Sequence, residues 1–143
     1  MGTIETRWLK DGLRNWLLSK KSGLYPQASY MIQGMLNILE QVAGVLAPFR
    51  SGELRYSHIV EMGGLEGVMY PTAFHAIFVI LGTKPHPIEP VNKLALWWPG
   101  AWHPVKHVDH PGTSPQDYIN EVVPNSEPGL EQEENKFLDW LST

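Results

Sequence analysis

Histidine is the residue type in this chain best suited to chemistry. Four of the six histidines lie between residues 86 and 110, at His86, His103, His107 and His110. His103 and His107 have the i, i+4 spacing that pairs zinc ligands on a helix. Pro104 and the flanking pattern instead predict an extended chain, which would hold their backbones ~13 Å apart. Two imidazoles so placed cannot easily share an ion whose bonds are ~2 Å long.

His86 with His110 is the strongest remaining metal pairing. The two histidines lie in echoing segments, GTKPHP at 82–87 and HPGTSP at 110–115. Each also precedes a proline, as His103 does, and this favours extended backbone. We therefore interpret the histidines as turn or surface residues and expect neither a resident metal nor another cofactor. His86 and His110 stay as candidate ligands, and a His-dependent metalloenzyme encoded by a phage stays as an alternative function.

Nucleophilic catalysis has no support in the motifs. The chain lacks cysteine, which removes thiolate nucleophiles, disulfides and Cys-ligated metal sites. It also lacks a G-x-S-x-G elbow, a P-loop and a G-x-G-x-x-G fingerprint. We therefore predict no catalytic residues and a protein that is not an enzyme.

Three of the six tryptophans lie close together, at Trp97, Trp98 and Trp102. Adjacent residues of a strand point to opposite faces, so at least one of Trp97 and Trp98 should meet solvent or a partner. Three interpretations remain open for Trp98 and Trp102. They belong to the core, to a subunit interface, or to a platform that stacks bases or sugars.

The elements that must position these residues begin with helices. Apolar spacing predicts a helix over 3–20 that Ser22-Gly23 ends, and a long helix over 27–46 that starts after Pro26. A short helix is expected over 115–123, with Ser114 as its cap. A linker follows at 124–129, and a last helix covers 130–141.

Strands are expected between these helices. Alternating and β-branched segments predict strands over 53–62, 74–81, 93–98 and 102–109. The expected fold class is therefore α+β, with N-terminal helices, one of them long, packed on an antiparallel sheet or β-meander and followed by short C-terminal helices.

Length and charge indicate how many domains the chain has and where its charge lies. With 143 residues it fits one domain, predicted over 1–123. Residues 121–143 hold six acidic residues against one lysine, a net charge of −5. Since the whole chain carries −4, residues 1–120 carry +1. We expect 124–143 to be an acidic C-terminal extension that is either a solvated face or a docking tail. No run of about 18 apolar residues and no signal-peptide pattern is present, so no membrane association is expected.

Three segments, in order, resemble the head–tail joining and tail-completion proteins of tailed phages. The first is APFRSGELRYSH at 47–58, similar to "A-P-hydrophobic-x-[ST]-G-x-L-R-x-S". The second is HAIFVILGTKPHPI at 75–88, similar to "Y-A-x-x-V-E-x-G-T-x-P-H-x-I". The third is VKHVDHPGTSPQDYI at 105–119, similar to "V-x-H-P-G-T-x-x-x-x-F-[LI]". His75, Leu81 and the Trp-rich run at 97–103 depart from the family pattern.

The resemblance implies a structural protein of the virion neck or tail, present in the host cytoplasm during assembly. Such proteins form six-fold or twelve-fold rings between portal–adaptor and tail-terminator or tail-tube proteins. Double-stranded DNA passes through their channel without sequence-specific binding. A tail terminator or minor tail protein is the alternative position. The candidate interface and structural residues are Pro48, Ser51, Gly52, Leu54, Arg55, Gly82, Thr83, His86, Trp98, Trp102, His110, Pro111, Gly112 and Thr113.

Overall fold

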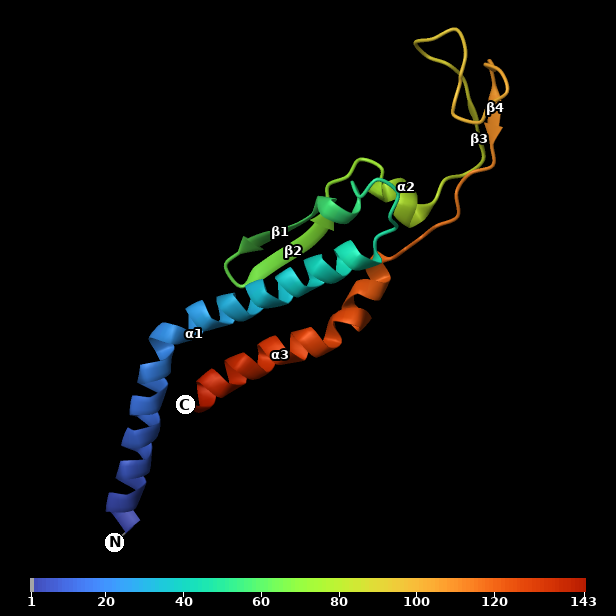
Figure 1. Ribbon diagram of the computed structural model, residues 1–143. Helices are drawn as coiled ribbons and strands as arrows, with labels where there is room; N and C mark the ends of the chain where they lie inside the picture. Colours follow the sequence, from blue (N-terminus) through green and yellow to red (C-terminus); the bar gives the residue numbers. More distant parts are fainter. Residues whose placement is uncertain (1) are drawn as a thin grey trace.

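The computed structural model describes the backbone of residues 2–143 and the side chains from residue 12 onward. Its elements run in the order α1 (Gly2–Leu46), β1 (His58–Gly63), β2 (Glu66–Pro71), α2 (Ala76–Leu81), β3 (His86–Ile88), β4 (Val108–His110) and α3 (Val122–Ser142). The long helix α3 lies along α1, and both small antiparallel sheets have two strands (Figure 1). The α+β class and the long N-terminal helix are therefore confirmed.

Helix α1 is continuous, so the prediction of two helices separated at Ser22-Gly23 was wrong. Gly23 lies against α3, where an added Cβ would come within 2.8 Å of the Trp140 ring. The Lys20 ammonium donates a hydrogen bond to the Trp140 carbonyl at 2.8 Å. This packing offsets the cost of a helical glycine, about 1 kcal/mol. Pro26 lies inside the helix, where proline commonly causes a bend, and Figure 1 shows α1 bending in its blue part.

Helix α3 replaces the predicted short helix, linker and last helix. Pro124 falls in its first turn, where the backbone N–H groups have no partner within the helix, and the proline is therefore tolerated. Pro128 lies inside the helix, and Gly129 packs on α1 beside Ile38. The expected linker over 124–129 was therefore wrong, and the predicted boundary at 123/124 falls within the first turn of α3.

The first sheet is a hairpin beside α1. Strands β1 and β2 pair antiparallel with His58 opposite Pro71, and Gly64 at φ +74° lies in the turn. The prediction of a strand over 53–62 is confirmed only for its second half, because residues 55–57 form a 3-10 turn. The strand predicted over 74–81 was wrong, since it contains helix α2. A short apolar run does not distinguish a strand from a helix by period alone.

The second sheet belongs to an extended arm, which we define as residues 83–113. Strands β3 and β4 pair antiparallel at its base, and Leu96 with Val105 forms an isolated bridge further out. The strands predicted over 93–98 and 102–109 are confirmed only at that bridge and at β4. The predicted meander was wrong, because the two sheets are separate. Figure 1 shows the arm leading away from the rest of the chain.

The buried core of the described residues is small and lies near the C-terminal end of α1. It groups Ala47, Leu54, Ala76 and Tyr118. The chain exposes 11158 Å² of surface, whereas a folded monomer of this mass exposes about 7,500 Å². Among residues 2–143 no helix combines the length and apolar character that a membrane crossing requires.

Candidate assembly surface

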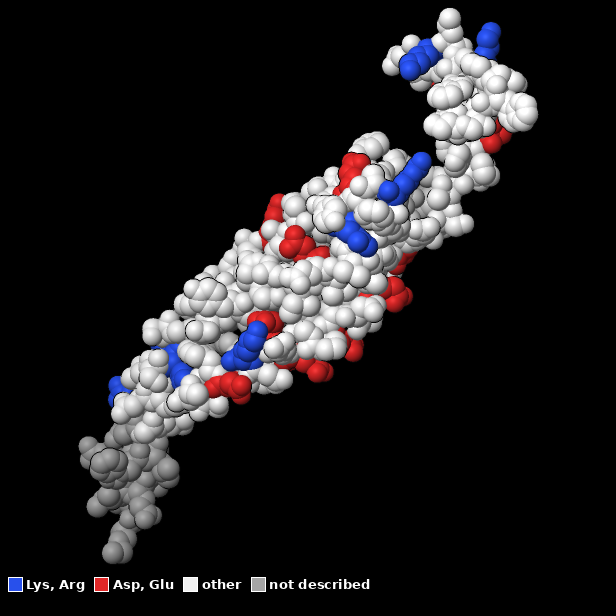
Figure 2. All heavy atoms as spheres, in the orientation of Figure 1, with Lys and Arg blue, Asp and Glu red and all other residues white. Residues whose placement is uncertain are grey.

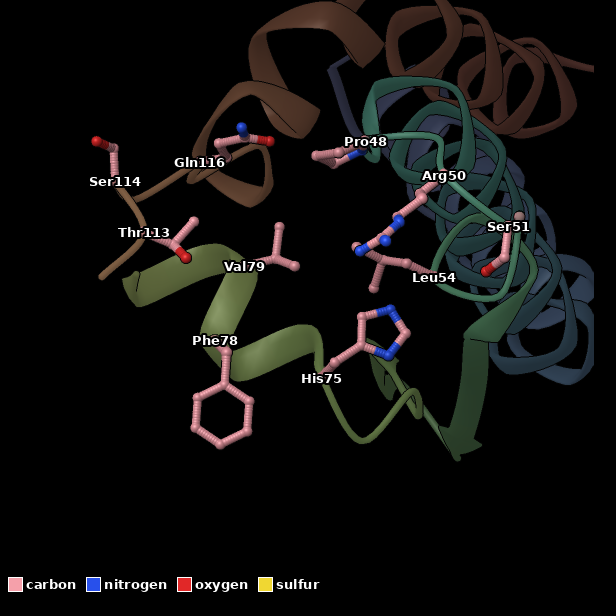
Figure 3. A pocket seen from close by; sticks show the side chains of 11 residues that line it. Pro48, Arg50, Ser51, Leu54, His75, Phe78, Val79, Thr113, Ser114 and Gln116 are labelled. Atoms are coloured by element: carbon pink, nitrogen blue, oxygen red, sulfur yellow. The ribbon is translucent and has the colours of Figure 1, made fainter. Parts of the chain in front are cut away.

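The three segments that carry the family resemblance meet around one cleft. It has a volume of about 720 Å³ and lies where the loop after α1, helix α2 and the chain leaving the arm come together (Figure 3). Its walls comprise Pro48, Arg50, Ser51, Gly52, Leu54, His75, Phe78, Val79, Thr113, Ser114 and Gln116. Residues up to 68 positions apart therefore form one local structure.

The loop after α1 is shaped by its proline and glycine. Pro48 follows the last turn of α1, and Gly52 adopts φ +86°, a conformation that favours glycine. A Cβ at Gly52 would also lie 3.1 Å from the Tyr56 ring. Leu54 then turns inward and is buried in the core. The Ser51-Gly52 turn thus carries the chain from α1 towards the hairpin.

An arginine and a histidine side chain lie at the cleft. In Figure 3 the Arg50 guanidinium and the His75 ring point toward one another across the opening. The His75 Nδ1 lies 4.0 Å from a Glu53 carboxylate oxygen, at an exposed site where such a pair contributes little to stability. Arg55 lies beside the cleft, stacks on Phe49 and donates a 3.4 Å hydrogen bond to the backbone of Val45. The cleft thus combines apolar walls with positive charge.

The base of the arm is held by two Gly-Thr turns that face each other. The Thr83 N–H donates to the Thr113 carbonyl at 2.9 Å, and the Thr113 N–H donates back at 3.0 Å. Gly82 at φ +70° and Gly112 at φ +86° precede the two threonines. A Cβ on either glycine would overlap the carbonyl of the opposite threonine. Glycine is therefore required twice, for its φ angle and for the close approach.

His86 and His110 are brought together directly above these turns. They are register partners, and their rings stack at a centroid distance of 5.1 Å. The His86 Nδ1 donates to the Lys84 carbonyl at 2.8 Å, and the His110 Nδ1 accepts from the Gly112 N–H at 3.0 Å. Each ring thus stabilises the turn next to it through a hydrogen bond to the backbone. Pro111 follows His110 and leads into the Gly112-Thr113 turn. Among the side chains that the structure describes, no group of three or more potential ligands gathers around a metal position.

His107 forms an exposed pair of contacts within the arm. Its Nε2 lies 2.9 Å from Asp109 and its Nδ1 lies 3.6 Å from Glu89. The hydrogen bond to Asp109, aided by that carboxylate's charge, raises the pKa of His107. His103 is also exposed and is not brought near it.

The tip of the arm, which we define as residues 90–106, holds the clustered tryptophans. Trp102 is fully exposed, and Trp97 and Trp98 are 63% and 47% exposed. Val91 and Leu94 are each 93% exposed. The core interpretation of Trp98 and Trp102 is therefore wrong for this chain, while the interface and stacking interpretations stay as predictions. The tip lies apart from helix α2 and the C-terminal end of α1, beside which the cleft lies (Figure 1).

A buried polar pair near the cleft escaped the sequence analysis. The Tyr118 hydroxyl donates to the His58 Nε2 at 2.9 Å, and the His58 Nδ1 donates to the Arg55 carbonyl at 3.2 Å. His58 is 4% exposed and Tyr118 is 6% exposed. Burial raises the pKa of Tyr118 to about 12. The sequence signal for a buried His58 was its position among the alternating apolar residues of the strand predicted over 53–62.

Comparisons of the chain with models of protein families, with curated proteins and with solved structures found no match. The cleft, the arm and the exposed apolar surface are the features of the chain that bear on its function.

Proposed function

We propose that this chain is a structural subunit of a tailed-phage virion, a head–tail connector or tail-completion protein that forms a ring. The observation that carries the proposal is the convergence of the three family-like segments. They build one cleft, one pair of Gly-Thr turns and one stacked histidine pair. Each motif is weak alone, and their joint role in one local structure supports a common origin with that family.

The exposed surface supports assembly with other chains. The excess over a monomer of this mass is about 3,700 Å², while a standard protein interface removes about 1,600 Å² in total. Many large apolar side chains are exposed at both ends, among them Leu13, Trp16 and Leu17 on α1 and Trp102 on the arm. Isolated monomers rarely expose so much apolar surface.

The shape of the chain supports a ring rather than a symmetric dimer. The two ends of the elongated molecule differ, one being helical and the other the extended arm (Figure 1). Different surfaces that meet head to tail generate a closed ring when the rotation closes. We propose portal–adaptor proteins on one side and tail-terminator or tail-tube proteins on the other as its partners. DNA passes through the channel without sequence-specific binding.

Mass spectrometry and electron microscopy of purified virions test the proposed function. We expect the chain in stoichiometric amounts in the particle, in density at the neck or tail end. Infection with a phage that lacks the gene for this chain should accumulate unjoined heads and tails. A chain absent from the particle, with normal particles formed without it, would contradict the proposal.

A stacking module is the second candidate, favoured by the full exposure of Trp102 beside two other exposed tryptophans. Bases or sugars would stack on these rings at about 1–3 kcal/mol per base. Titration with single-stranded DNA or oligosaccharides, followed by tryptophan fluorescence, tests this function. An unchanged spectrum would exclude it and leave the assembly role intact.

A further inference from the structure

The arm tip carries positive charge among its exposed apolar residues. Between residues 90 and 106 the only fully charged side chains are Lys93 and Lys106, and no carboxylate is present. Both lysines are exposed, and Figure 2 shows basic side chains at the end of the arm. A partner surface for this tip must therefore supply apolar contacts and negative charge.

Helix α3 presents such a surface on an exposed face. Val123, Glu127, Glu131, Glu134 and Leu138 share one face by helical spacing, and all five are exposed. The only lysine of α3, Lys136, pairs with Glu133 outside this stripe. We define these five residues as the acidic stripe, with an apolar residue at each end and three carboxylates between. Figure 2 shows acidic side chains along this edge of the molecule.

We infer that the arm tip of one copy docks on the acidic stripe of α3 in the next copy of this chain. The inference rests on the proposed ring and names the two surfaces that meet in it. Lys93 and Lys106 lie against the carboxylates, and the tryptophans cover Val123 or Leu138. A chain cannot make this contact with itself, because its own arm leads away from α3 (Figure 1).

The area of the contact matches what an interface requires. A buried aromatic side chain contributes 150–250 Å², so tryptophans that are 63%, 47% and 100% exposed supply about 300–500 Å². The exposed Val91 and Leu94 bring the contact toward the ~800 Å² per partner of a standard interface. Such a contact uses only part of the excess exposed surface of the chain. Apolar anchors supply most of the affinity, while the opposite charges set the register and make assembly dependent on salt.

A charge exchange tests the inference. The double variant Lys93→Glu/Lys106→Glu and the double variant Glu131→Lys/Glu134→Lys should each weaken self-association about tenfold or more. The combined four-site variant should recover it, because the charges again oppose. Sedimentation velocity of the purified full chain over a concentration series measures the change. Circular dichroism checks that each variant folds.

Matched controls use exposed residues outside both surfaces. Glu53→Lys with Glu66→Lys, in the loop after α1 and in strand β2, changes the same charge as Glu131→Lys/Glu134→Lys and should leave association unchanged. Trp102→Ala should weaken association roughly thirtyfold, whereas Tyr30→Ala, an exposed aromatic on α1, should not.

The outcomes separate the inference from the proposed function. Association lost in both double variants and regained in the combination supports the docking pair. Unchanged association in all of them, or a wild-type chain that stays monomeric throughout the series, overturns it. A Trp102 effect without any charge effect also overturns it, and points to the cleft of the neighbouring copy. The presence of the chain in virions tests the proposed function independently.

Discussion

The body and the arm of this chain are held together in different ways. In the body, the end of α1, the loop after it, α2 and the segment before α3 enclose a small core, and the His58 ring and the Tyr118 hydroxyl hydrogen-bond to each other there. In the arm, two antiparallel segments are fixed by backbone bonds, two glycine turns and stacked histidines, with the largest side chains exposed. The body carries the stability of the monomer, whereas the arm is a preformed contact surface that another molecule must cover.

Tyr118→Ala should have the largest effect and should act on the body alone. It removes a buried aromatic side chain and leaves His58 without its partner, which costs about 3–5 kcal/mol of the free energy of unfolding. Chemical denaturation followed by circular dichroism measures the loss. A variant as stable as wild type would show that this cluster does not hold the body together.

The free energy of unfolding should depend on pH in the alkaline range, because the buried Tyr118 hydroxyl resists deprotonation. Burial raises the pKa of Tyr118 in the folded state to about 12, whereas an exposed tyrosine of the unfolded chain has a pKa of about 10. The resulting stability is present below pH 10 and is lost as the pH rises toward 12, an effect of about 2–3 kcal/mol.

Tyr118→Phe is the matched control for this pH effect. It lacks the ionisable hydroxyl, so it should be about 1–3 kcal/mol less stable at pH 7, where His58 loses its hydrogen bond. The difference from wild type should narrow between pH 10 and 12. Parallel stability curves over that range would argue against burial of the hydroxyl.

Gly112→Ala should loosen the arm without unfolding the body. The positive φ costs about 1–3 kcal/mol for a residue other than glycine, and the Cβ would overlap the Thr83 carbonyl. Hydrogen exchange at the Thr83 and Thr113 amides should quicken by tenfold or more while the amides of α3 stay protected.

Gly100 supplies the control for this substitution, since it has φ +96° but nothing within 4 Å of an added Cβ. Gly100→Ala adds strain only and should affect exchange at the arm base little. Equal effects of the two variants would show that the reciprocal turns do not anchor the arm.

Trp102→Ala should have the smallest effect on the monomer, within about 0.5 kcal/mol, because its side chain is fully exposed. Measurement at a concentration low enough to prevent association checks this. A loss above 1 kcal/mol would show that the arm tip contributes to the body, and would remove the distinction between the two regions.

Several features could be predicted from the residues alone. The apolar spacing over 27–46 predicts the second half of α1. The echo of GTKPHP with HPGT indicated a relation between Gly82-Thr83 and Gly112-Thr113, and the structure places these turns face to face. Local sequence carries such information because turns and helix faces depend on neighbouring residues.

Other features depend on contacts between distant residues. Ser22-Gly23 and Pro124–Gly129 are helix-breaking by composition, yet both lie in helices because α1 and α3 pack against one another. The run at 76–81 forms a helix in which Ala76 is buried in the core and Val79 and Ile80 pack against it.

The sequence by itself determined the α+β class, the turn glycines, the charge separation and the tryptophan cluster, since these follow from residue type and short-range spacing. Only the tertiary structure decided that the three family-like segments share one cleft, that His58 is buried beside Tyr118, and that the tryptophans are exposed on an arm. The physical reason is that burial and long-range packing depend on where the chain returns, which no local pattern specifies.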